Sequence, residues 1–158
     1  ILIGPPHSRD DDFRAVNRLM DRDGVKVVCG GSTANMVGRV LERQVRVDLK
    51  STCDRVPPTG IIEGVDLVTE GVLTMAYSLE LLRTGVTVNQ LRSNRDGASR
   101  LAILLLEADS LNFLVGTSVN STQQINESSS RVLLKKQVIN DLINFLKEKG
   151  KKVTLEYF

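Results

Sequence analysis

Short apolar runs alternate with amphipathic stretches along the whole chain. The runs have the length of buried strands, and the stretches between them carry apolar residues at helical spacing. Strands are expected at residues 1–3, 25–29, 45–49, 65–68, 112–115 and 153–157. An alternation of strands and helices is typical of βαβ units, whose strands run parallel.

The helices are expected between these strands. The first has Asp10, Asp11 and Asp12 in its first turn, where carboxylates favour the positive end of the helix dipole, and the last closes at Gly150. Residues 84–97 and 117–130 are polar and are expected as irregular loops. The pattern predicts a three-layer α/β/α sandwich with a mostly parallel, Rossmann-like sheet of about six strands. The final strand is the candidate for a reversed one.

Size and composition indicate one globular domain over residues 1–158. The chain has 158 residues, of which 41% are hydrophobic and 25% charged, which is ordinary for a folded domain. It starts inside an apolar run and without Met, so we expect it to be the C-terminal fragment of a longer protein.

Charge and aromatic content exclude several classes of partner. The net charge is +2 and the chain has two Tyr, four Phe and no Trp, so no basic, aromatic surface for nucleic acid is expected. No apolar run approaches the roughly 20 residues of a membrane span. Cys29 and Cys53 lack metal-ligand spacing, which indicates a reducing, cytoplasmic compartment.

Glycines stand at the ends of four predicted strands: Gly4, Gly30, Gly71 and Gly116. In open α/β sheets ligands bind beyond the carboxyl ends of the strands, and glycine lets the backbone approach a ligand closely. The alternative is that these glycines serve only the turns. The candidate ligand contacts at this edge are Gly4, Pro5, Gly30, Gly31, Ser32, Thr33, Asn35, Thr69, Glu70, Gly71 and Gly116.

The segment from Gly30 to Thr33 carries the sharpest signal, because it follows a strand and opens a helix. Free amide hydrogens at the positive end of a helix dipole suit a phosphate or a carboxylate. A plain helix cap by Ser32 or Thr33 is the alternative. The dinucleotide fingerprint is not met, since Cys29 stands where that pattern has glycine, and no Lys follows as in a Walker loop.

Other polar residues are open to two interpretations each. Asp48 ends a strand, where it could bind a ribose or cap a turn, and His7 could contact a ligand but has no partners for a zinc site. Glu70 is the candidate general base, although it has no evident partner at a fixed spacing. Asp96-Gly97 is similar to the aspartate-glycine pair of metal-dependent phosphatases, and its position favours a helix start.

Residues 2–6, 27–35, 63–74, 96–102 and 152–157 resemble the C-terminal region of bacterial SpoIIE-family serine/threonine phosphatases. The resemblance is to the subgroup in which an α/β extension follows the phosphatase domain. It implies a parent protein that dephosphorylates phosphoserine or phosphothreonine with two Mn²⁺ or Mg²⁺ ions. The metal-binding aspartates would belong to the upstream domain, so no metal or cofactor is expected in this chain.

A second resemblance is to ribose-phosphate isomerases and their sugar-phosphate-sensing relatives, through residues 31–34 and 65–71. Those enzymes carry Asp-Gly-Ala-Asp where this chain has Glu70-Gly71-Val72-Leu73, which breaks their pattern of catalytic acids.

Three hypotheses follow from the sequence. The first is a regulatory domain of a SpoIIE-type phosphatase that binds an anionic, phosphate-bearing small molecule. The second is a sugar-phosphate isomerase-like enzyme, with Glu70 as base, or a sensor of sugar phosphates. The third is a structural or dimerisation module, which forms a homodimer in the latter case.

Overall fold

The computed structural model describes residues 1–118 and 125–158, and the side chains of residues 1–118 and 132–158. Its strands are β1 (Leu2–Ile3), β2 (Val27–Cys29), β3 (Arg46–Asp48), β4 (Thr59–Ile61), β5 (Leu67–Thr69), β6 (Ser110–Val115) and β7 (Lys152–Tyr157). Its α-helices are α1 (Asp12–Met20), α2 (Gly31–Val40), α3 (Val72–Arg83), α4 (Val88–Leu91), α5 (Gly97–Glu107) and α6 (Ile125–Glu148). Two short 3-10 helices, Arg9–Asp11 and Leu49–Ser51, precede α1 and follow β3.

The strands form one sheet in the order β3-β4-β5-β2-β1-β6-β7. Neighbours from β5 to β7 pair in parallel, whereas β4 runs antiparallel to both β3 and β5. The strands β2 to β5 all lie on one side of β1, and β6 and β7 lie on its other side. The topology therefore changes direction between β1 and β6, the kind of place where α/β proteins bind ligands.

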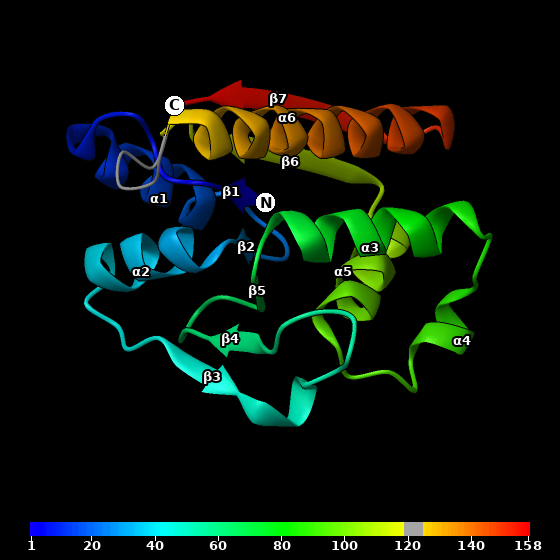
Figure 1. Ribbon diagram of the computed structural model, residues 1–158. Coiled ribbons are helices and arrows are strands. Elements are labelled where there is room, and N and C mark those ends of the chain that lie inside the picture. Colours follow the sequence, from blue (N-terminus) through cyan, green and yellow to red (C-terminus); the bar gives the residue numbers. More distant parts are fainter. Residues whose placement is uncertain (119–124) are drawn as a thin grey trace.

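Helices cover both faces of the sheet, which confirms the predicted three-layer α/β/α sandwich (Figure 1). Alternate residues of the strands face opposite layers: Leu2 and Val28 pack with α1 and α2, whereas Ile3 and Cys29 pack with α3, α5 and α6. This is the period of two that a pleated strand imposes. The second of these cores is the larger, and the candidate site lies above it.

The reversed strand is β4 and not the last one, so the expectation for residues 153–157 was wrong. β7 pairs in parallel with β6 over six residues, from Ser110↔Lys152 to Val115↔Tyr157. The 24 residues of α6 return the chain along the sheet, which a parallel crossover requires. β4 was missed because Pro57-Pro58 and Gly60 have the composition of a turn. A side chain at position 60 would crowd Val68, whose Cγ1 lies 2.9 Å from the place of a Cβ.

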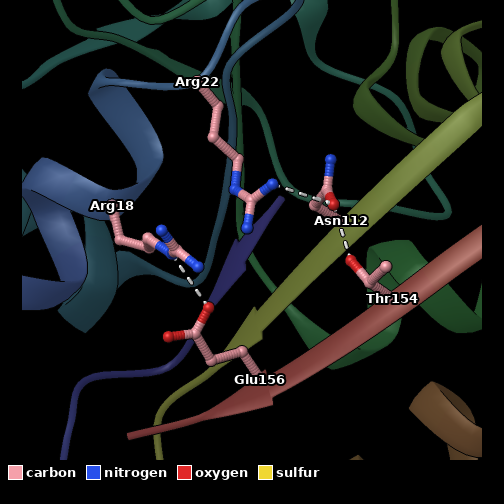
Figure 2. A network of polar contacts seen from close by, with 5 residues as sticks. All are labelled: Arg18, Arg22, Asn112, Thr154 and Glu156. Carbon is pink, nitrogen blue, oxygen red and sulfur yellow. Dashed lines mark hydrogen bonds and ion pairs between the residues drawn. The ribbon is translucent and has the colours of Figure 1, made fainter.

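Polar contacts tie the first helical layer to the last strand (Figure 2). Arg18 of α1 donates from Nε to the Glu156 carboxylate at 3.0 Å. Arg22, just after α1, donates to the side-chain oxygen of Asn112 at 3.2 Å, and the Thr154 hydroxyl donates to the same oxygen at 2.6 Å. Residues from both ends of the chain thus hold β6 and β7 in register.

Two predicted loops contain helices. Within residues 84–97, α4 is closed by a capping box between Thr87 and Gln90 and buries Leu91. The polar tract 117–130 is helical from Ile125 onward, and its residues 119–124 lie outside the described part of the chain. Both segments are poor in apolar residues, so their local sequence pattern gave little sign of a helix.

Candidate functional site: a glycine-lined cleft at the carboxyl edge of the sheet

A cleft of about 650 Å³ opens above the carboxyl ends of β1, β2 and β5, between α3 and α6. It lies beside the point where the topology changes direction. The described residues that line it are Ile3, Gly4, Pro5, Cys29, Gly30, Gly31, Ser32, Thr33, Glu70, Gly71, Val72, Leu73, Met75, Ser118, Val132, Leu134 and Lys135. Eight of the eleven candidate contacts named from the sequence are among them.

Gly30 and Gly71 form the centre of the cleft and open α2 and α3. Their φ angles of 115° and 152° are conformations that residues with a side chain rarely adopt. A Cβ on Gly71 would lie 3.4 Å from the Cα of Gly30, so the two turns touch. The amide of Gly30 donates to the carbonyl of Thr69 at 2.9 Å, which joins the two turns at the sheet edge. The glycines bring two helix N-termini into one cleft.

Both helices begin without a side-chain cap. The first intrahelical bond of α2 runs from Ala34 to the Gly30 carbonyl, and that of α3 from Met75 to Gly71. The amide hydrogens of residues 31–33 and 72–74 therefore have no acceptor among the described residues. Each helix start carries roughly half a positive charge, so the centre of the cleft attracts anions.

Thr33 holds this arrangement together. Its side chain is fully buried; the hydroxyl accepts the amide hydrogen of Gly4 at 2.9 Å and donates to the carbonyl of Cys29 at 3.0 Å. Because the one hydroxyl hydrogen is used, Thr33 can offer a ligand only its amide. Ser32, next to it, is exposed and also lines the cleft.

Lys135 lines the cleft and was not among the candidates named from the sequence. It lies on α6, and its amine reaches into the cleft and donates to the carbonyl of Gly116 at 2.8 Å. No carboxylate of the described residues lies within ion-pair distance of this amine. Burial lowers the pKa of Lys135 from its ordinary value, and the charge of neighbouring Lys136 lowers it further. Among the residues whose side chains the structure describes, the half-buried cation thus has a carbonyl partner and no carboxylate partner.

Three candidate contacts lie outside the cleft wall. Gly116 is buried against β1's turn, where a Cβ would overlap the Pro5 carbonyl, so close packing accounts for this glycine. Thr69 is buried below the cleft, and its hydroxyl finds no partner within the described chain. Asn35 is exposed on α2 and does not line the cleft.

Glu70 places one carboxylate on the cleft wall. Its side chain is exposed, and no hydrogen bond or ion pair to it is seen among the described residues. His7 is exposed near Pro5 and does not line the cleft. Within residues 1–118 and 132–158, no group of three His, Cys, Asp or Glu is placed to hold a metal ion. In the part of the chain that the structure describes, the cleft therefore has the parts of a binding site and lacks a paired acid and base.

Other polar candidates serve the fold. Asp96 caps α5, accepting the amide hydrogens of Ala98 at 3.0 Å and Ser99 at 2.9 Å, as its position favoured. Asp48 accepts the amide of Lys50 and so caps the short helix after β3. Cys29 forms part of the cleft floor, and burial raises the pKa of its thiol, which disfavours the reactive thiolate.

Comparison with models of protein families, with curated proteins and with solved structures gave no match. None of the described helices combines the length and the apolar character needed to cross a lipid bilayer.

Proposed function

We propose that this chain is a regulatory domain that binds a phosphate-bearing small molecule in the cleft between α3 and α6. One observation carries the proposal: the Lys135 amine and two uncapped helix N-termini face the same cleft. Amide hydrogens, helix dipoles and an amine all stabilise a phosphate, and the three sources stem from separate elements. The geometry of the turns could explain the glycines by itself. It does not explain why a lysine of α6 lies in the same cleft.

The charges fit one phosphate group. Lys135 supplies one positive charge and the two helix starts add roughly half a charge each. Glu70 subtracts one, so the charges of the described residues of the cleft add up to about one positive charge. A monophosphate, with about −1.5 to −2 at pH 7, is matched better than a polyphosphate.

A thermal-shift titration tests the proposal with inorganic phosphate, nucleotides and sugar phosphates as probes. A ligand at one hundred times its dissociation constant should stabilise the fold by about 2.7 kcal/mol. For a chain of this length that corresponds to a rise in melting temperature of roughly 5–10 °C.

Two variants locate the site. Gly31→Val fills open space, since nothing lies within 4 Å of the place of its Cβ, and it should remove the shift while the ligand-free protein still folds. Lys135→Met should weaken binding at least tenfold, and Lys136→Met is the matched control because Lys136 is exposed on the same helix. Absence of a shift with every anion would contradict the proposal and favour a structural or dimerising module.

The association with a SpoIIE-type phosphatase is part of the same proposal and rests on the resemblance of the sequence. It predicts that the reading frame preceding Ile1 encodes a phosphatase domain with metal-binding aspartates. A frame encoding an unrelated domain, or none, would contradict it. Phosphatase activity of the 158-residue chain by itself would contradict the accessory role.

A second candidate function is catalysis on a sugar phosphate, because Glu70 lies on the wall of the same cleft as the proposed phosphate. A carboxylate beside a bound phosphate could move a proton on the attached carbon chain. Turnover of an isomerisable sugar phosphate that is lost in Glu70→Gln, with phosphate binding kept, would establish this function. Binding of the sugar phosphate without turnover would instead favour the regulatory domain.

A further inference from the structure

We infer that the ligand is a phosphate monoester with an aliphatic body, which lies between α3 and α6 against Leu73 and Leu134. This inference rests on the proposed function, since it assigns the phosphate to the helix N-termini and asks what the rest of the cleft holds.

The cleft is much larger than a phosphate ion. Its volume is about 650 Å³, in the middle of the range of roughly 300–1,000 Å³ that small-molecule sites show. A phosphate ion takes the place of only a few waters, each with a share of about 30 Å³. The cleft therefore has room for the group that carries the phosphate.

The polar and the apolar parts of the lining come from different places. The polar part lies at the edge of the sheet, where α2 and α3 begin without a side-chain cap and where the Lys135 amine lies. Among the described residues, the apolar part of the lining comes from side chains of the two flanking helices and the strand ends: Ile3, Val72, Leu73, Met75, Val132 and Leu134. The division into a charged end and an apolar wall matches a molecule with an anionic head and an apolar body.

Leu73 and Leu134 are the exposed members of this wall, with 61% and 48% of their surfaces open to solvent. One comes from α3 and the other from α6. Covering both would remove apolar surface from water at the mouth of the cleft, which favours binding by about 25 cal/mol per Å². A sugar would gain little here, because Ser32, Glu70 and Ser118 are the only polar side chains of the lining, besides Lys135 and the buried Thr33, among the described residues.

The lining also disfavours a nucleobase. No aromatic side chain is among the described residues of the cleft, so a base would find no ring to stack on. Aliphatic groups need no such partner and pack against leucine and valine. An alkyl or acyl chain is therefore the body that this wall fits.

Calorimetric titration with inorganic, methyl, butyl and hexyl phosphate tests the inference. Each buried methylene should raise the affinity about fourfold, so that butyl phosphate, with three more methylenes, binds roughly 60 times more tightly than methyl phosphate. AMP serves as the nucleotide probe and should bind more weakly than hexyl phosphate.

Variants of the two leucines test whether these side chains cause the rise in affinity with chain length. Leu73→Asn and Leu134→Asn should each reduce the dependence on chain length, while the affinity for inorganic phosphate stays within a factor of two. Leu133→Asn is the matched control, because Leu133 is 67% exposed on the same helix and does not line the cleft. Lys135→Met should instead weaken every member of the series by the same factor.

The outcomes separate the two proposals. If inorganic phosphate binds and the affinity does not rise with chain length, the inference is overturned and the anion site stands. A tighter complex with AMP than with hexyl phosphate also overturns it. If no phosphate compound binds at all, the proposed function itself fails.

Discussion

Replacing Thr33 by Val tests whether the Thr33 hydroxyl holds the cleft together. Valine has nearly the same shape and lacks the hydroxyl that joins the Gly4 amide to the Cys29 carbonyl. The variant therefore leaves two backbone groups without their partner, and Gly4 and Cys29 are both buried.

The magnitude follows from those two groups. Leaving a buried donor or acceptor unpaired costs about 1–3 kcal/mol. Part of the loss is recovered because the hydroxyl itself no longer needs to be desolvated. We expect the free energy of unfolding to fall by about 2–3 kcal/mol, which lowers the melting temperature by roughly 5–10 °C.

Thr74 offers an unusually close control. It is the third residue of α3 after Gly71, just as Thr33 is the third residue of α2 after Gly30. Both threonines are fully buried, but the hydroxyl of Thr74 has no partner among the described residues. Thr74→Val should therefore be neutral or stabilise the protein by up to about 1 kcal/mol.

Urea denaturation of the two variants and the parent, followed by far-UV circular dichroism, measures the difference. Equal denaturant slopes would show that the free energies can be compared. If Thr33→Val changes the free energy of unfolding by less than 0.5 kcal/mol relative to Thr74→Val (about the scatter for a neutral surface substitution), the hydroxyl does not hold β1 to α2 as we argue.

Three further predictions concern the surroundings of the cleft. Gly116→Ala should lower the free energy of unfolding by at least about 3 kcal/mol, because the new Cβ would overlap the Pro5 backbone. Gly31→Ala should cost nothing, since its Cβ would lie in open space. Denaturation measures both variants, and equal effects would refute the packing argument. Asp96→Ala should cost about 1–2 kcal/mol through the lost cap of α5 and leave phosphate affinity unchanged; a loss of binding would mean that Asp96 serves the site. Without ligand, the free energy of unfolding should rise with pH between the lowered pKa of Lys135 and its unfolded value of 10.5, because the unfolded chain holds the proton longer there; Lys135→Met should abolish this rise, and a rise that persists would assign it to another group.

The architecture was predictable because its determinants are local. Apolar runs marked β1, β2, β5 and β6, and the change to helical spacing after each run indicated the crossovers. β4 escaped because a three-residue strand with Gly60 at its centre is held by its neighbours in the sheet and not by its own composition. The direction of β7 depended on the long helix before it, whose start falls in a polar stretch.

The parts of the candidate site also differ in how far the sequence predicts them. Gly30 and Gly71 were predictable, because a chain that leaves a strand and enters a helix beside another backbone requires glycine wherever it occurs. Lys135 was not, because it is one of several lysines on an amphipathic helix and only the packing of α6 on α3 brings it over Gly4. The roles of Thr33 and Ser32 were also inseparable in sequence, since either hydroxyl suits a helix start.

The shortest strand of the sheet, β1, connects the strands on its one side with the strands on its other side. β1 contributes only Leu2 and Ile3, which pair with β2 on one side and β6 on the other. A molecule in the cleft would contact Gly30 and Gly71 from one side and Ser118 and Lys135 from the other. A bound molecule would therefore link the two sides of the sheet across β1. Binding at turns from the first half of the chain would slow the separation of β6 and β7, which come from its second half.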